Sequence, residues 1–245
     1  VVSRRSQGLS IGVNLNPDKI CNFDCPYCQV DRTIPPRFQE VDPQVLYAEL
    51  DAMLTMAATD RFWSHPPFDT VAAPLRVVRD IAFSGDGEPT SSAHFRQAIE
   101  AAVSLREQHG LSELDLVLIT NASLFHKPAV SAALDYFSQV GGVVWAKLDA
   151  GTEPYFQKVC GTSIPFSLIL RNIQQRAKVS PVVLQCMFLR YEGQAPGTHE
   201  REAWARRVQE ILDGGGRIDD VQIYTVARNP ADPACGPLEE ELLEE

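Results

Sequence analysis

The stretch Cys21-Asn22-Phe23-Asp24-Cys25-Pro26-Tyr27-Cys28 contains three cysteines spaced C-x3-C-x2-C, with an aromatic residue directly before the last one. Three thiolates on one loop can bind three irons of a cubic [4Fe–4S] cluster, whereas most electron-transfer clusters are closed by four cysteines. The fourth iron would then be open to a substrate or cofactor. We therefore expect Cys21, Cys25 and Cys28 to be metal ligands in a site that performs chemistry.

No fourth metal ligand lies close to these cysteines in the sequence, which argues against a structural zinc site. Zinc sites of that kind usually have four Cys or His ligands, and the first histidine after the loop is His65. A zinc-stabilised binding domain is kept as an alternative. The other cysteines, Cys160, Cys186 and Cys235, lie far apart without paired spacing. We therefore expect them to be buried free thiols and the cluster to be a single one.

Composition and charge restrict the class of protein. The chain has 245 residues, of which 44% are hydrophobic and 22% charged, and its formal net charge is -10. These values are typical of a globular protein with a substantial core. The acidic charge is unfavourable for binding nucleic acid through its phosphates. No apolar run approaches the roughly 18 residues that span a bilayer, and no signal peptide is visible at Val1, so no membrane association is expected.

The cysteines also indicate the redox environment. Three of the six crowd one loop instead of forming a disulfide framework, which predicts reduced thiols and a cytoplasmic location. The first residues are not expected to be the natural N-terminus. We predict one domain over residues 1–245, with a core at about 10–230 and an acidic C-terminal extension at 231–245.

Apolar, β-branched runs alternate with segments of helical periodicity, as in repeated strand–helix units around a parallel sheet. Six strands are predicted, at residues 11–15, 80–84, 115–120, 143–149, 182–189 and 221–226. Helices are predicted at about 42–59, from 91 or 92 to 109, and at 128–137, 165–178, 201–212 and 238–245. A long loop is expected at 61–74. The α/β pattern by itself fits either an open partial barrel or a flat doubly wound sheet.

A second candidate site follows the second predicted strand, at Ser84-Gly85-Asp86-Gly87-Glu88-Pro89-Thr90. Glycines let the backbone turn sharply and approach a ligand closely. Glu88 adds an anionic site, and carbonyl groups at a strand end can hold an ammonium group. The alternative is a solvated strand-to-helix turn, because such turns are common. The position one strand after the cysteine loop favours a ligand site, since ligands of α/β folds bind at the carboxyl ends of strands.

The three-cysteine motif and the following glycine–glutamate–proline turn together resemble the radical S-adenosylmethionine (SAM) superfamily. In that family the open iron of a [4Fe–4S] cluster chelates the amino and carboxylate groups of SAM. An electron from the reduced cluster cleaves SAM to methionine and a 5′-deoxyadenosyl radical, which abstracts hydrogen from a substrate. The resemblance implies that Gly85, Asp86, Gly87, Glu88 and Pro89 hold the cofactor's amino group, and that the cluster ligands are Cys21, Cys25 and Cys28. Asp86 stands where the commoner motif has glycine.

Further segments narrow the resemblance and imply a partial (β/α)6 barrel over about residues 10–230. Thr120-Asn121-Ala122 is similar to a Thr-Asn-Gly segment of related enzymes that lies near the ribose and methionine parts of the cofactor. Residues 145–152 and 221–230 resemble strands of a subgroup that includes wyosine-base-forming tRNA enzymes and uncharacterised iron–sulfur oxidoreductases. The resemblance implies Asn121 and Tyr27 as cofactor contacts.

Lys147 and Asp149 are the candidate catalytic residues, and both are also candidates for cofactor binding. They point inward from the strand at 143–149, because the intervening Leu148 points the other way. Lys147 can bind a substrate carboxylate, form a Schiff base or contact the cofactor, and Asp149 can bind a ribose hydroxyl or orient Lys147. A structural ion pair at the barrel mouth is the alternative. Gln185 is a candidate ribose contact, or else a satisfied core amide.

We expect an enzyme with an unidentified substrate. Wyosine-type tRNA modification, activation of a glycyl-radical enzyme, and reaction on a small molecule or peptide all remain open, although the acidic charge disfavours RNA. An external electron donor of the flavodoxin or ferredoxin type is expected. A non-catalytic iron–sulfur electron carrier would explain the cysteines but not the turn at residues 85–89.

Overall fold

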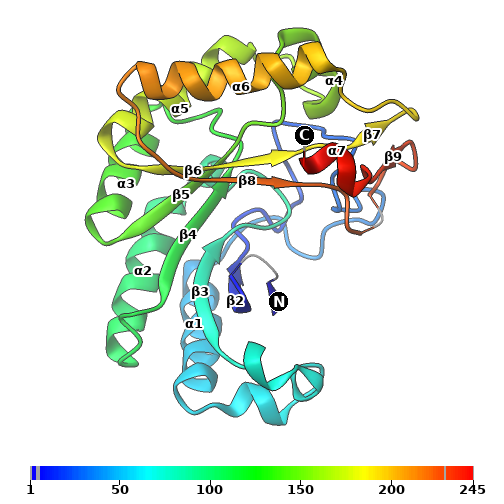
Figure 1. The fold of residues 1–245 in the computed structure, drawn as a ribbon. Helices are drawn as coiled ribbons and strands as arrows, with labels where there is room; N and C mark the ends of the chain where they lie inside the picture. Colours follow the sequence, from blue (N-terminus) through cyan, green and yellow to red (C-terminus); the bar gives the residue numbers. More distant parts are fainter. Residues whose placement is uncertain (1, 4–5, 229, 245) are drawn as a thin grey trace.

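The computed structural model describes residues 2, 3, 6–228 and 230–244, and its centre is a curved seven-stranded sheet (Figure 1). The strand order is β1-β2-β3-β4-β5-β6-β8. Neighbouring strands from β2 to β8 are parallel, and β1 is antiparallel to β2. The strands of this sheet are β1 Val2–Ser3, β2 Gly8–Val13, β3 Val78–Phe83, β4 Asp115–Thr120, β5 Gly142–Lys147, β6 Val182–Met187 and β8 Ile218–Tyr224.

Helices connect the parallel strands and cover the outer face of the sheet (Figure 1). A short antiparallel pair and a terminal helix lie beyond β6 and β8, at the carboxyl edge. The remaining elements are α1 Pro43–Ala58, α2 Phe95–Gln108, α3 Pro128–Gln139, α4 Glu153–Cys160, α5 Phe166–Val179, β7 Arg190–Tyr191, α6 Thr198–Asp213, β9 Cys235–Gly236 and α7 Glu240–Glu244.

Along a strand of the sheet, buried and half-buried side chains alternate between the outer and the inner face. On β5, Val144 and Ala146 are buried in the main core with the helices, whereas Val143, Trp145 and Lys147 are only half-buried. Successive side chains of a strand point to opposite faces, so the second set lines the concave inner face. Lys147 is thereby placed inside the half-barrel, near its carboxyl edge.

The partial barrel is confirmed, and β2, β3, β4, β5, β6 and β8 correspond to the six predicted strands. The predicted strand at 143–149 is too long, because β5 ends at Lys147 and Asp149 lies in the following loop. The predicted strand at 182–189 ends at Met187, beyond which β7 pairs with β9 instead.

Three short 3-10 turns occupy the predicted loop at 61–74 and extend one residue beyond it, at Arg61–Ser64, Phe68–Thr70 and Ala73–Leu75. The helix α4 was not predicted. Residue 245 of the predicted terminal helix and residue 1 of the predicted domain lie outside the described residues. Among the described residues, no helix has the length and apolar character needed to cross a bilayer.

Candidate functional site

The cysteine loop connects β2 to α1 at the carboxyl edge of the sheet (Figure 1). Cys21, Cys25 and Cys28 are free thiols, and all three are half-buried. The amide of Cys28 donates to the carbonyl of Cys25 at 2.9 Å, which closes a turn between two of the cysteines. The loop therefore places three half-buried cysteines where ligands of α/β folds bind.

The carboxyl end of α4 supports this loop. The amide of Asp24 donates to the carbonyls of Cys160, at 3.2 Å, and Gly161, at 3.3 Å. Gly161 has a φ of +55°, and an added Cβ would collide with the Asp24 carbonyl. Glycine is required there because it allows both the left-handed backbone and the close approach. The helix that sequence analysis missed thus fixes the position of the cysteines.

Neighbouring groups favour the thiolate form of Cys25. Hydrogen bonding to the Cys160 thiol lowers the pKa of Cys25, burial opposes this change, and the charge of Lys147 again lowers the pKa. Burial raises the pKa of Cys21. Partial burial lowers the pKa of the Arg32 guanidinium. A hydrogen bond to Cys28 and the charges of the thiolates outweigh burial and raise this pKa. Because metal ligation requires deprotonated thiols, Arg32 and Lys147 offset the negative charge of the ligand set.

The donor set fits an iron–sulfur cubane better than a single zinc ion. Within the part of the chain that the structure describes, no three His, Cys, Asp or Glu side chains converge as ligands of one ion. Zinc ligands must converge on one atom, whereas cysteines of a cubane each bind a different iron. Three soft thiols on one loop, beside a guanidinium, match the ligand type of such a cluster.

The turn after β3 packs directly against the loop that follows β2. A Cβ added to Gly85 would collide with Asn14, and one added to Gly87 would collide with Asn16 and the Ile20 carbonyl. The side chain of Asp86 accepts a hydrogen bond from Asn14 Nδ2 at 2.9 Å, and the Asp86 amide donates to Asn14 Oδ1 at 3.2 Å. The two glycines are therefore needed to bring this turn against the segment that leads into the cysteine loop.

Glu88 holds the ends of β3 and β4 together. Its side chain is 2% exposed, and burial raises the pKa of its carboxyl against the effect of its hydrogen bonds. Oε1 accepts from Thr90 N at 3.1 Å, from Thr90 Oγ1 at 2.5 Å and from Thr120 Oγ1 at 2.6 Å, and Oε2 accepts from Asn121 N at 2.8 Å. Protein donors thus engage both oxygens of the carboxylate that the sequence suggested as an anionic site. Pro89 follows as the first residue of the short turn Pro89–Ser91.

Asn121 connects the end of β4 to the cysteine loop. Its Nδ2 donates to Asn22 Oδ1 at 2.8 Å, and its Oδ1 accepts from the amide and hydroxyl of Ser123. Asn22 Nδ2 in turn donates to Ser123 Oγ at 2.7 Å. Ala122 has a φ of +60°, the left-handed region that glycine adopts most readily. Asn121 was a predicted site residue, whereas Asn22 was not, because its partners are about a hundred residues away in the sequence.

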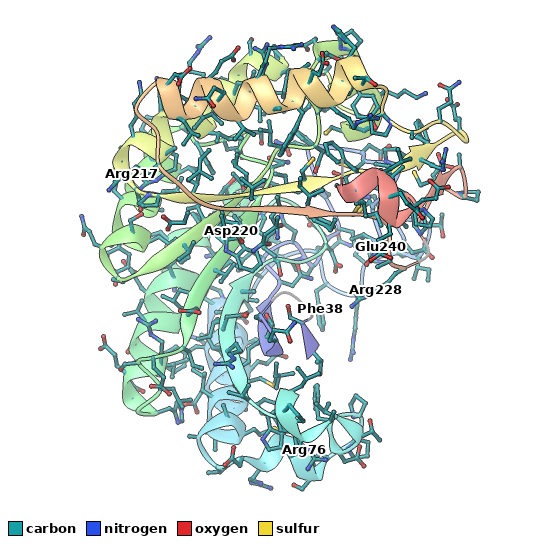
Figure 2. All side chains as sticks on the ribbon, viewed as in Figure 1. Phe38, Arg76, Arg217, Asp220, Arg228 and Glu240 are labelled. Atoms are coloured by element: carbon teal, nitrogen blue, oxygen red, sulfur yellow. The ribbon has the colours of Figure 1, made fainter. Side chains whose placement is uncertain are left out.

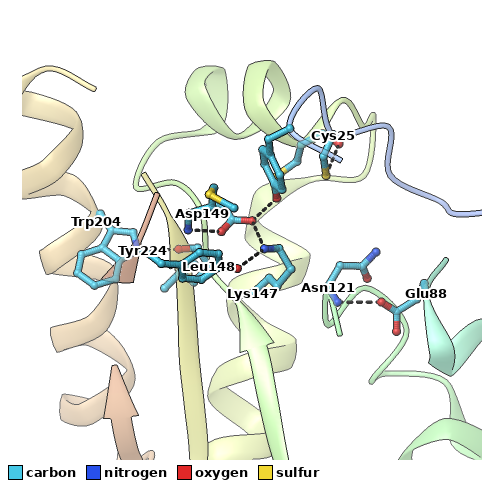
Figure 3. A network of polar contacts seen from close by, with 11 residues as sticks. Cys25, Glu88, Asn121, Lys147, Leu148, Asp149, Trp204 and Tyr224 are labelled. Carbon is cyan, nitrogen blue, oxygen red and sulfur yellow. Dashed lines mark hydrogen bonds and ion pairs between the residues drawn. The ribbon is translucent and has the colours of Figure 1, made fainter. Parts of the chain in front are cut away.

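Lys147 and Asp149 form the centre of a buried network (Figure 3). Lys147 Nζ lies 3.3 Å from Asp149 Oδ2 and donates to Tyr224 OH at 3.0 Å. Tyr27 OH donates to Asp149 Oδ2 at 2.5 Å, and the amide of Met187 donates to Asp149 Oδ1 at 2.8 Å. Asp149 is 3% exposed. The network therefore joins the cysteine loop to β5, β6 and β8.

The same network keeps Lys147 protonated. Burial alone would lower its pKa, but the charge of Asp149 and the interaction with Tyr224 outweigh burial and raise the pKa. Schiff-base formation needs a neutral amine, so this environment favours a positively charged hydrogen-bond donor instead. Of the two roles expected for Asp149, the geometry matches the orientation of Lys147.

Gln185 is fully buried next to Lys147 in the register of β5 and β6. Its Nε2 donates to Gln222 Oε1 at 2.8 Å, and Gln222 Nε2 donates to Asp220 Oδ2 at 3.2 Å. Asp220 lies on the side of β8 away from α6 (Figure 2). Within the described residues Gln185 Oε1 has no hydrogen-bond partner, so the amide is only half satisfied.

The loop after Lys147 is held by α6, which sequence analysis did not connect with the site. Trp204 Nε1 donates to the Leu148 carbonyl at 2.7 Å (Figure 3). Glu200 accepts from the amides of Gly151 and Thr152 and from the Thr152 hydroxyl. In the sequence these contacts are signalled only by a glutamate and a tryptophan on a polar helix, and residue type alone does not identify their partners.

Comparison with known proteins identifies the family and the fold. The sequence model described as the radical SAM superfamily matches residues 15–196, which include the cysteine loop and the turn after β3. A UPF0026 protein of Helicobacter pylori strain J99 is 29% identical over 161 residues, covering 65% of this chain and 44% of that protein. This chain therefore spans less than half the length of that relative.

Two solved structures share the fold. A radical SAM methyltransferase from Sphaerobacter thermophilus has a TM-score of 0.63 at 13% identity, covering 97% of this chain and 60% of that chain. Native anSMEcpe with bound AdoMet has a TM-score of 0.58 at 16% identity, covering 89% of this chain and 52% of that chain. With a family match over most of its length, a half-barrel fold and three cysteines on the loop after β2, this chain belongs to the radical SAM superfamily.

Proposed function

We propose that this chain is a radical SAM enzyme that holds a [4Fe–4S] cluster through Cys21, Cys25 and Cys28. The observation that carries the proposal is the presence of three free, half-buried thiols on one loop at the carboxyl edge. The cluster and SAM together would supply a 5′-deoxyadenosyl radical for hydrogen abstraction. A solved structure with the same fold contains AdoMet, which supports SAM as the ligand of the open iron.

The turn at residues 85–89 would bind the amino group of SAM through its backbone. The carboxylate of Glu88 is occupied by Thr90, Thr120 and Asn121, so carbonyl oxygens are the acceptors that remain for an ammonium group. Glu88 and Asn14 would act by holding the turn in place.

The inner face offers complementary groups for the rest of the cofactor and for substrate. Lys147 is a protonated donor oriented by Asp149 and Tyr224, suited to a carboxylate of SAM or substrate. Gln185 Oε1 is a buried acceptor without a described partner, suited to a ribose hydroxyl. Buried polar groups are normally satisfied, and a bound ligand would supply the missing donor to Gln185.

Activity also requires a reductant and a substrate from outside the chain. We propose a flavodoxin- or ferredoxin-type protein as the electron donor, because cluster reduction needs single electrons at low potential. No contact among the described residues favours tRNA or a glycyl-radical enzyme over a small molecule or peptide.

The test is anaerobic reconstitution followed by iron and sulfide analysis and reduction with dithionite in the presence of SAM. We expect about four irons and four sulfides per chain, and formation of 5′-deoxyadenosine. Cys25→Ala should lose the cluster, whereas Cys186→Ala is the matched control, because Cys186 is buried on β6 in the core facing the helices. An intact cluster with bound SAM and no 5′-deoxyadenosine would instead indicate an electron carrier.

A further inference from the structure

The segment that follows β8 lies directly against the cysteine loop (Figure 1). The amide of Ala231 donates to the carbonyl of Cys28 at 2.8 Å, and the amide of Asp232 donates to the carbonyl of Pro26 at 3.2 Å. These two hydrogen bonds join segments near opposite ends of the sequence. We call residues 230–236 the strap. Sequence analysis assigned residues 231–245 to an acidic extension and gave them no part in the site.

Asp232 fixes the shape of the strap. Its Oδ1 accepts from the amide of Ala234 at 2.8 Å, and its carbonyl accepts from the amide of Cys235 at 3.1 Å. A side-chain oxygen that accepts from the backbone two residues further on forms an Asx turn, which both Asp and Asn can make. The turn leads into β9, which is paired with β7, so the strap is anchored at its carboxyl end.

Apolar packing also holds the strap against the cysteine loop. Cys235 is 7% exposed and belongs to one buried cluster with Tyr27, Met187 and Leu189. Tyr27 is the residue directly before the last cysteine of the motif, and its hydroxyl donates to Asp149. The strap therefore packs on the same side chain that joins the cysteine loop to the buried network of β5, β6 and β8.

The cysteine motif is thus held from two sides. Carbonyls at the end of α4 accept from the amide of Asp24, and the strap donates to the carbonyls of Pro26 and Cys28. Ordering a flexible loop when a ligand binds costs conformational entropy, and a loop that is ordered beforehand avoids this cost. The contacts of the strap supply such ordering at residues 26–28.

We propose that the strap orders the carboxyl end of the cysteine motif and thereby slows loss of the cluster. Asp232 is a positioning residue, because it shapes the turn that keeps the strap amides on the carbonyls of Pro26 and Cys28, and it does not bind iron. The effect requires no covalent or redox step. This inference rests on the proposed function, because it requires the cluster.

The first test measures release of iron from anaerobically reconstituted protein to the ferrous chelator bathophenanthroline disulfonate in the presence of dithionite. Asp232→Ala removes the acceptor of the turn, whereas Asp232→Asn keeps an oxygen at Oδ1 and is the matched control. Loss of one hydrogen bond of ordinary strength should make iron release about fivefold faster in Asp232→Ala. Asp232→Asn should release iron at the wild-type rate.

The second test is hydrogen exchange of the cluster-free protein, which examines the strap without the metal. The amides of Ala231 and Asp232 should be protected in the wild type and in Asp232→Asn. Both should exchange about fivefold faster in Asp232→Ala, because the strap then opens locally more often. The amide of Leu118 in the centre of β4 should keep its wild-type rate, which shows that the rest of the fold is intact.

Several results would overturn the inference. One is an absence of protection at Ala231 and Asp232 in the wild type, and another is iron release at equal rates in Asp232→Ala and the wild type. Release that is equally fast in Asp232→Asn would assign the effect to charge, and faster exchange at Leu118 would assign it to general unfolding. Wild-type protein without a cluster would refute the proposed function as well, whereas a cluster released at equal rates would refute this inference alone.

Discussion

Replacing Glu88 with glutamine keeps the shape of the side chain but exchanges one acceptor oxygen for a donor. In the native structure Oε1 accepts three hydrogen bonds, from Thr90 and Thr120, and Oε2 accepts one from the amide of Asn121. Glutamine can keep its oxygen at the three-donor position only by placing its NH2 group against the Asn121 amide. One buried backbone donor then loses its partner and faces another donor.

The expected loss of stability follows from these contacts. A hydrogen bond to a charged group contributes about 1.5–3 kcal/mol, and leaving a buried donor unsatisfied costs about 1–3 kcal/mol. The neutral amide avoids the cost of burying a charge, which offsets part of the loss. We therefore expect Glu88→Gln to lower the free energy of unfolding by about 3 kcal/mol.

Urea unfolding of the cluster-free protein measures this change, with Glu107→Gln as the matched control. Glu107 is exposed on α2, and its substitution should change the free energy of unfolding by less than about 0.5 kcal/mol. Hydrogen exchange of the Asn121 amide should also become faster in Glu88→Gln. The reasoning about Glu88 is refuted if both variants have the stability of the wild type and exchange at Asn121 is unchanged.

Two further substitutions test a buried carboxyl on β3 and the hydrogen bond from α6 to the loop after β5. Burial and the charge of Asp115 raise the pKa of the Asp80 carboxyl, although a hydrogen bond from Ser10 opposes the change. The stability that Asp80 provides is therefore complete below its pKa in the unfolded chain, about 3.9. This stability is lost as the pH rises through the raised pKa of the folded protein. Asp80→Asn should therefore be at least as stable as the wild type at pH 7, with a smaller advantage at pH 4 in thermal unfolding; a larger deficit at pH 7 would contradict this. Trp204→Phe removes the donor to the Leu148 carbonyl and should cost about 2 kcal/mol in urea unfolding, and a loss below about 0.5 kcal/mol would show that this bond is unimportant.

The sheet was predictable because its strands are apolar runs of ordinary length separated by helical periodicity. Parallel strands place their carboxyl ends at one edge, so the cysteine loop, the turn after β3 and Asn121 could be expected to meet. The helix α4 was missed because it has only eight residues and its apolar positions form less than three turns. The pair β7 and β9 has two residues in each strand, too few for any pattern.

The roles of individual side chains were less predictable, because they depend on partners far away in sequence. Glu88 looked like an anionic ligand site until its carboxylate was seen to bind donors from β4. The contact between Cys160 and Cys25 depends on where α4 ends. Lys147 and Asp149 could be paired from their spacing, but Tyr27 and Tyr224 as their partners could not.

The central claim is a cluster with one iron that has no protein ligand. Electron–nuclear double resonance on the reduced cluster, with SAM isotopically labelled at its amino nitrogen, tests this most directly. The account predicts a hyperfine coupling between that nitrogen and the cluster in the wild type and in Cys186→Ala. An intact reduced cluster that shows no coupling at saturating SAM would contradict it.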